Sequence, residues 1–321
     1  MNRRTFLGIA AAVAAMDINM NAQTTAIPII DTHIHLFDPR RPEGIPWPPK
    51  DDTKLYKPAL PERFLKVTEG QGVVGAIEVE ASPWLEDNQW VLDVAAKAPV
   101  IVGTVGDLEP EKPDFPKQLE RFHRNPLFLG IRCGNLWGRN IREQLGNPDF
   151  VRGLKELADA GLEMDTANPD PELIAAVVRL TDLVPNLRVV IDHLPQMKEP
   201  TESKVKKELE ANLQELGKRP QVYVKVSEVL RLVDGHLRLD LDFYKPKLDR
   251  LWDIFGEDRL IYGSDWPNSD HIEDYPQELT LVREYLHSKG RAAAEKVFWK
   301  NSVAAYRWKK RDPKQPDPRT A

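Results

Sequence analysis

Three histidines and one aspartate stand where the sequence predicts strands to end. His33 and His35 are separated by one residue at the end of an apolar run, and alternation along a strand places both side chains on one face. His193 follows a second apolar run and Asp265 follows a third. Alone, each has an ordinary explanation: a surface histidine, a hydrogen-bonded core histidine or a helix cap. Three imidazoles and a carboxylate also suit zinc or a similar divalent metal, so together they predict a metal site.

These residues need a scaffold that brings distant strand ends together. Eight short apolar segments, most of them rich in Val and Ile, are typical of parallel strands buried on both faces. They cover residues 27–33, 73–80, 100–105, 128–133, 162–165, 187–191, 222–226 and 259–262. Helical patterns lie between many of them, at 149–160, 171–183, 245–255 and 277–289. This alternation favours a single (β/α)₈ TIM barrel over a doubly wound sheet, with functional groups at the C-terminal strand ends.

The ends of the 321-residue chain differ from its middle in composition. We assign residues 27–308 to the barrel, residues 1–26 to an export signal and residues 309–321 to a disordered tail. Arg3 and Arg4 precede a short alanine-rich apolar run, which resembles a twin-arginine signal, with a general secretory signal as the alternative. We expect export, to the periplasm, with cleavage between residues 15 and 26.

Composition also limits the partners. The net charge of −5 gives no reason to expect nucleic acid or an anionic membrane surface. Outside the signal no apolar stretch is long enough to cross a membrane. We therefore expect a small-molecule substrate, and a homodimer is an arrangement that such barrels often adopt. The long proline-rich segment 39–61, which contains Trp47, is expected to cap the barrel mouth.

Further polar and aromatic side chains follow strand ends. Arg132 would bind a substrate carboxylate or a developing oxyanion, or form an internal salt bridge. Lys225 would stabilise a developing negative charge, or only neutralise a carboxylate. Glu80 and Asp165 would serve as a further metal ligand or as substrate-binding groups, or would orient a His or Arg. Three tryptophans would stack on a sugar ring, or merely pack loops: Trp84, Trp137 and Trp266.

The chain resembles the amidohydrolase-related family (amidohydrolase 2) of the amidohydrolase superfamily, from Asp31 to about Trp308. Residues 31–38 match its opening motif, residues 262–267 its closing motif and residues 130–132 an element of its fourth strand. Residues 190–194 are similar to the Asp-His-x-Gly-x-Pro run of the lactonase branch, which acts on sugar lactones, sulfomuconolactone and pyrone dicarboxylate. Pro195 stands where that run has its Gly.

The resemblance implies a metal-dependent hydrolase that opens a lactone of a small sugar acid or carboxylic acid. Asp265 would be the general base and His193 a second catalytic residue. The fourth strand offers no Lys to be carbamylated, so we expect one metal, zinc or manganese, although some lactonases of this family use none. Two alternatives remain open: a metal-dependent decarboxylase of an aromatic or unsaturated acid, and a degenerate periplasmic binding protein.

Overall fold

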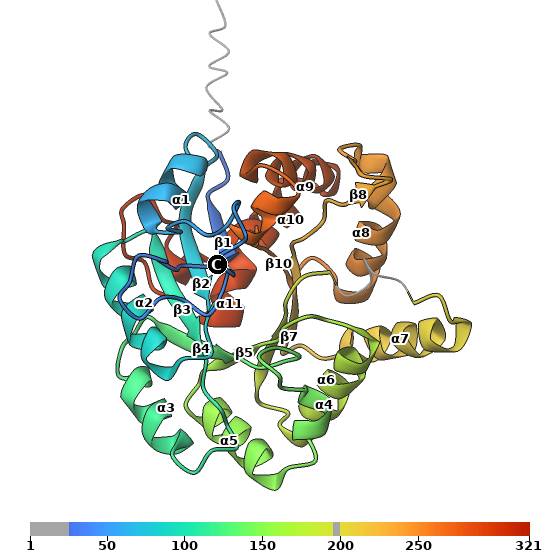
Figure 1. The fold of residues 1–321 in the computed structure, drawn as a ribbon. Helices are drawn as coiled ribbons and strands as arrows, with labels where there is room; N and C mark the ends of the chain where they lie inside the picture. The colour runs from blue at the N-terminus through green and yellow to red at the C-terminus, as the bar shows by residue number, and fades with distance from the viewer. Residues whose placement is uncertain (1–25, 195–199) are drawn as a thin grey trace, which may run out of the picture.

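The computed structural model of the chain describes residues 26–194 and 200–321. Its main sheet has eight parallel strands that follow one another in chain order. They are β1 (Ile29–Ile34), β2 (Val73–Val79), β3 (Ile101–Gly106), β4 (Phe128–Arg132), β5 (Glu163–Asp165), β6 (Arg188–Ile191), β7 (Val222–Val226) and β10 (Leu260–Tyr262). The last strand returns to the first, because Asp265 N–H donates to the His33 carbonyl at 2.8 Å and His35 N–H donates to the Trp266 carbonyl at 2.7 Å. The predicted (β/α)₈ barrel is confirmed (Figure 1).

Helices surround the strands and cover their outer face (Figure 1). They are α1 (Pro61–Val67), α2 (Leu85–Lys97), α3 (Phe115–His123), α4 (Ile141–Gln144), α5 (Pro148–Asp159), α6 (Pro171–Leu183), α7 (Ser203–Leu216), α8 (Leu241–Phe255), α9 (Tyr275–Lys289), α10 (Arg291–Glu295) and α11 (Asn301–Tyr306). A short hairpin, β8 (Leu232–Val233) with β9 (His236–Leu237), precedes α8. None of the described helices is long and apolar enough to cross a membrane.

Local sequence explains where the predicted helices begin. Asp170 caps α6 by accepting the Leu173 N–H at 2.7 Å, and the helix spans the predicted residues. The prediction for α8 began at residue 245, but the helix starts four residues earlier, at Leu241. The carboxylate of Asp240 accepts the Phe243 N–H there and starts the helix, so Pro246 lies inside it.

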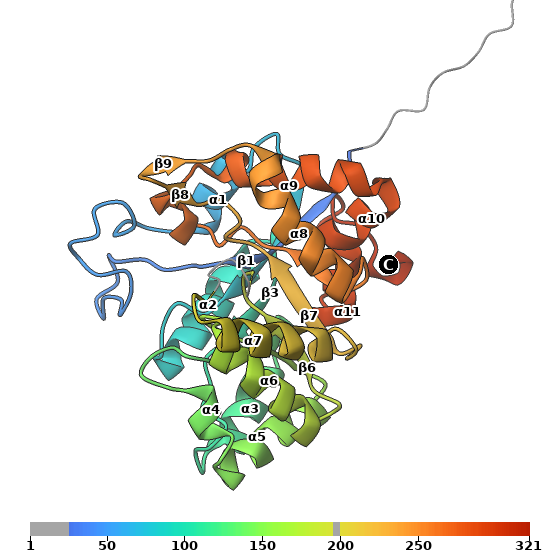
Figure 2. The ribbon, with the colours of Figure 1, turned by 90° about the vertical axis from the view of Figure 1, so that its right-hand side faces the viewer.

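The segment between β1 and α1 extends beyond the strand ends (Figure 2). A backbone bridge between Phe37 and Ala59 joins its two ends. Within it, the Trp47 ring meets His35 edge-on, with 5.6 Å between ring centroids. This agrees with the expectation that the segment covers part of the barrel mouth.

The C-terminal residues pack against the opposite end of the barrel. Gln315 is 1% exposed, and its amide donates to the carbonyls of Val74 at 3.1 Å and Pro99 at 2.9 Å. The Arg311 guanidinium donates to the carbonyls of Ala95 and Ile101. The expected disordered tail at 309–321 does not match this arrangement, because polar side chains in the tail satisfy backbone groups around β2 and β3. The expected signal, except for residue 26, and Pro195 lie outside the described residues.

Candidate functional site

The predicted ligands converge at the C-terminal strand ends of the barrel. One nitrogen each of His33 and His35 and one oxygen of Asp265 lie within 4.8 Å of one another, and the same is true of His193, Glu228 and Asp265. His35 Nε2 lies 3.1 Å from Asp265 Oδ1, and His33 Nε2 lies 3.4 Å from the same oxygen. The rings of His33 and His193 are 4.7 Å apart between centroids. These two groups share Asp265 and could hold a divalent metal.

Each imidazole has one nitrogen anchored and the other turned toward the shared site. His35 Nδ1 lies 2.7 Å from the Val79 carbonyl, to which it donates, and this contact directs Nε2 toward Asp265. His193 Nδ1 bonds the Ser227 hydroxyl at 2.9 Å. His33 Nε2 is buried and has no hydrogen-bond partner among the described residues. A bound cation would give this buried nitrogen the partner that it lacks and would also be coordinated by the neighbouring Asp265 carboxylate. The residues therefore fit a metal.

The local backbone at two of these positions is unusual for residues with a side chain. His193 and Asp265 have φ of 63° and 58°, a region that non-glycine residues seldom adopt. His193 lies two residues after the end of β6 and Asp265 three residues after the end of β10, where the chain turns over the mouth. Such conformations persist where the surrounding structure imposes them and cluster at functional sites.

A chain of buried charges lies beneath the histidines. The Lys225 ammonium, which has no exposed surface, lies 2.5 Å from Asp165 and 2.8 Å from Asp192. It also lies 3.1 Å from His33 Nδ1, and Asp192 Oδ1 lies 3.4 Å from the same nitrogen. Arg132 Nε donates to Asp192 at 2.9 Å. The network therefore fixes the His33 ring from the side opposite the candidate metal.

This network sets the ionisation of its members. Burial alone would raise the pKa of Asp192, but Lys225, His33 and Arg132 together hold it well below its ordinary value. Burial and the nearby Lys225 ammonium lower the pKa of His33, which keeps its ring neutral as metal binding requires. Burial would likewise raise the pKa of Asp265, yet His193, His35 and His33 lower it, so this carboxylate is ionised at neutral pH.

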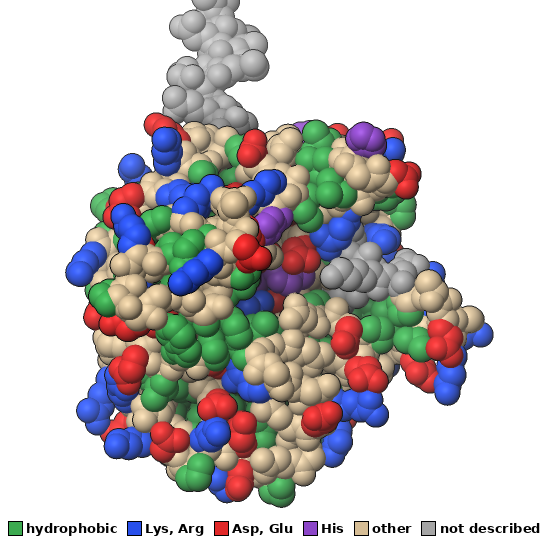
Figure 3. Space-filling model, viewed as in Figure 1, with side chains coloured by type: hydrophobic (Ala, Val, Ile, Leu, Met, Phe, Trp, Pro, Cys, Tyr) green, Lys and Arg blue, Asp and Glu red, His purple; other side chains and the backbone are tan. Residues whose placement is uncertain are grey.

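From outside, the site is a hollow near the centre of the face that carries the strand ends. Histidine and acidic side chains gather in it, and hydrophobic side chains and uncharged or backbone atoms surround it (Figure 3).

Comparison with known proteins agrees with this geometry. The model of the amidohydrolase family matches residues 30–308. The chain belongs to the amidohydrolase family. The resemblance inferred from the motifs is confirmed, and so is the prediction of an enzyme of the hydrolase class.

Relatives of this amidohydrolase cover nearly all of the barrel. L-fucono-1,5-lactonase from Burkholderia ambifaria is 29% identical over 287 residues, which cover 87% of this chain and 95% of that protein. An amidohydrolase from Burkholderia multivorans with bound zinc superposes with a TM-score of 0.76 at 22% identity, covering 88% of this chain and 99% of that one. A dihydroxybenzoic acid decarboxylase from Polaromonas with bound manganese has a TM-score of 0.62 at 14% identity, covering 87% and 97%. At these identities the two structures share the fold with this amidohydrolase.

Several side chains proposed for substrate binding in this amidohydrolase have other partners. Lys225 and Asp165 are fully buried and paired with each other, so neither reaches the mouth, and the alternative of charge neutralisation describes them. Trp266 also has no exposed surface, because its ring packs on Phe64 at 5.4 Å under the Arg63 guanidinium. It packs a loop instead of facing substrate. Trp84 is 39% exposed just before α2, and its stacking role stays a prediction.

Arg132 and Glu80 form a second pair at the mouth. Arg132 is 7% exposed, and its Nη1 lies 3.7 Å from Glu80, whose carboxylate also accepts from Trp137 Nε1 at 3.1 Å and from the Ser82 N–H at 2.9 Å. Burial raises the pKa of Glu80 to about 8, although Arg132 opposes the shift. Among residues 26–194 and 200–321, Glu80 does not belong to either group of side chains that could hold a metal ion. The structure places it beside Arg132 instead of making it a metal ligand.

Sequence reasoning missed four residues that the structure brings to the site. Glu228 reaches 3.9 Å from His193 Nε2, and Ser227 anchors the same ring. Both directly follow β7, so the rule that found His193 would have found them too. Asp192 was recognised only within a motif, and Glu78, inside β2, was passed over as part of an apolar strand.

Proposed function

We propose that this amidohydrolase hydrolyses a lactone of a small sugar acid or carboxylic acid. The observation that carries the proposal is the convergence of three imidazoles on the Asp265 carboxylate, with His33 Nε2 buried and unpartnered. The lactonase names of its relatives support the substrate class, and the zinc and manganese of the structural neighbours support a divalent metal.

A metal would be held by His33, His35, His193 and Asp265, with Glu228 within reach of His193. When bound, a divalent ion polarises a carbonyl oxygen and lowers the pKa of water to about 7. The protein keeps its ligands ready for this role. The His33 ring is neutral, Asp265 is ionised, and the second nitrogen of each ring is fixed by Val79, Ser227 or the Lys225 and Asp192 pair.

Asp265 is the residue best placed to move the proton. Its Oδ2 accepts from Asn268 at 2.7 Å, which orients the carboxylate, while Oδ1 faces the histidines. Asp265 takes a proton from the attacking water and returns it to the ring oxygen that leaves as a hydroxyl. His193 presents Nε2 to the same space and helps to position the carbonyl. The Arg132 guanidinium supplies positive charge for the developing oxyanion.

The experiment that tests this proposal is elemental analysis of the purified protein, paired with acid release from a panel of sugar and muconic lactones. We expect about one zinc or manganese per chain, and turnover that is lost on chelation and restored by the metal. Lactone hydrolysis by metal-free protein would assign the histidines to substrate contact. Release of carbon dioxide from aromatic acids, with no acid from lactones, would replace the proposal with decarboxylation.

A further inference from the structure

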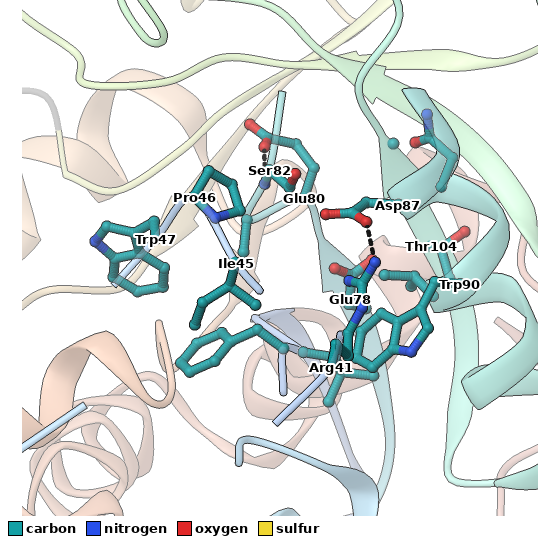
Figure 4. A pocket seen from close by; sticks show the side chains of 16 residues that line it. Arg41, Ile45, Pro46, Trp47, Glu78, Glu80, Ser82, Asp87, Trp90 and Thr104 are labelled. Atoms are coloured by element: carbon teal, nitrogen blue, oxygen red, sulfur yellow. Dashed lines mark hydrogen bonds and ion pairs between the residues drawn. The ribbon is translucent and has the colours of Figure 1, made fainter. Parts of the chain in front are cut away.

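A second hollow adjoins the histidine site and is not used by the mechanism above. It lies between the β1–α1 segment, the ends of β2 and β3, and α2, and its space of about 420 Å³ is partly open to solvent (Figure 4). Trp47 lines it and also meets His35, while Glu80 lines it and also pairs with Arg132. Trp47 and Glu80 therefore lie between this hollow and the histidine site.

Glu78 is the unexplained group in this hollow. Its side chain is 1% exposed, and Oε1 has no hydrogen-bond partner among the described residues. The nearest cation lining the hollow, Arg41, is paired with Asp87 at 2.5 Å and stacked on Trp90. Burial, reinforced by Glu80, raises the pKa of Glu78 well above its ordinary value, which favours the protonated carboxyl. A buried polar oxygen left without a partner destabilises the fold, which indicates that a ligand completes it.

The walls limit what that ligand is. Arg41, the cation that lines the hollow, is already paired with Asp87, so an anionic substituent would be buried there without a free counter-charge. A hydroxyl group both donates and accepts, which matches a protonated carboxyl. The room available to water-sized groups is about 20 Å³, near the 10–15 Å³ that a single water needs. Phe37, Ile45 and Val91 add apolar surface, which suits the carbon that carries such a hydroxyl.

We propose that this hollow is a subsite for an uncharged, hydroxyl-bearing arm of the substrate, and that Glu78 is its specificity-determining residue. The inference rests on the proposed lactonase function and deepens it. It assigns the substrate to polyhydroxylated sugar lactones and excludes lactones that carry a carboxylate on that arm.

Glu78→Met and Glu78→Gln test the proposal against two lactones, a six-membered sugar lactone and unsubstituted δ-valerolactone. Loss of one hydrogen bond should raise KM for the sugar lactone by about 3–10-fold in Glu78→Met, with kcat unchanged. Glu78→Gln keeps a donor and an acceptor and should stay within about 3-fold of the wild type. Hydrolysis of δ-valerolactone should be the same in all three proteins. An equal loss on both lactones would overturn the assignment.

Stability separates this role from a structural one. Glu78→Met removes an unpartnered buried oxygen but also the hydrogen bond that the carboxyl accepts from the Leu36 backbone. These two effects oppose each other, so the melting temperature should stay near that of the wild type, whereas a structural glutamate would leave the variant clearly less stable. Glu257→Met, at the opposite end of the barrel where Glu257 pairs with Lys296, is the matched control and should keep the wild-type KM. A clear fall in melting temperature for Glu78→Met would count against the proposal.

A binding experiment keeps the subsite testable if the proposed function fails. Saturation-transfer NMR with a sugar alcohol at millimolar concentration needs no turnover. Signals in the wild type and in Glu257→Met that vanish in Glu78→Met would support the subsite even if no lactone were hydrolysed. Equal signals in the three proteins, or none in any, would refute it.

Discussion

Replacing Lys225 by methionine should cost this protein more stability than almost any other single change at the site. The ammonium has no exposed surface and lies between two carboxylates, 2.5 Å from Asp165 and 2.8 Å from Asp192. Removing one partner of a buried ion pair costs about 3–5 kcal/mol, because the other partner is left charged and desolvated. For a chain of this size about 2 °C of melting temperature corresponds to 1 kcal/mol, so we expect a fall of roughly 6–10 °C.

The loss of stability in Lys225→Met should depend on pH, and the shifted pKa values give the direction of that dependence. Lys225 holds the pKa of Asp192 well below its ordinary value, so the stabilisation is present above the unfolded pKa of about 3.8 and is lost as the pH falls. Burial raises the pKa of Asp165 to about 6 even with Lys225 beside it, and without the ammonium it would rise further. The gap between Lys225→Met and the wild type should therefore widen from pH 4 to pH 8.

Thermal unfolding followed by circular dichroism at several pH values measures both effects. Asp192 keeps its ion pair with Arg132 in Lys225→Met, so adding Asp165→Asn removes the acid that has lost its lysine partner and should recover part of the loss. Lys66→Met, on the exposed face of α1, is the matched control and should change stability by less than about 0.5 kcal/mol. A fall below about 2 °C at pH 7.5, or a fall that does not depend on pH, would refute the account of the buried network.

Three further predictions concern the mouth. Asp265→Asn should lower kcat by about 10²–10⁴-fold in steady-state assays, because the amide cannot accept the proton, and near-normal turnover would remove Asp265 as general base. Ser227→Ala frees His193 Nδ1, so metal affinity in a chelator competition should fall about 10–100-fold; unchanged affinity would show that His193 is not a ligand. Glu80 keeps its proton to about pH 8 when folded but loses it near 4.5 when unfolded, so stability falls as the pH rises through that window, by up to about 1.4 kcal/mol per unit. Glu80→Gln should show a shallower fall in urea unfolding at pH 5 and pH 8, and identical slopes would contradict the raised pKa.

The barrel and the main ligands were predictable because they depend on local pattern. Buried parallel strands read as apolar runs, and polar residues directly after such runs stand out. This is why His33, His35, His193 and Asp265 could be assigned from the chain alone. The family motifs then specified the reaction class, since they join these residues in a fixed order.

Charge pairing could not be predicted in the same way. Lys225 and Asp165 follow the strand pattern of substrate-binding residues, and only the closed barrel shows that they lie 2.5 Å apart with no access to the mouth. Trp266 follows a strand end, yet its ring turns outward under Arg63 and packs on Phe64. The direction of a side chain at a strand end depends on the local turn, and here Asp265 has the left-handed backbone that redirects it.

The sequence by itself therefore determined the elements, the fold class, the family and the four residues around the candidate metal, because each depends on periodicity or on a short motif. The tertiary structure decided which of the remaining polar groups face substrate and which face one another. It seated the C-terminal tail against the barrel and left Glu78 Oε1 without a partner among the described residues, because the contacts of a buried polar atom are made by residues far apart in the chain.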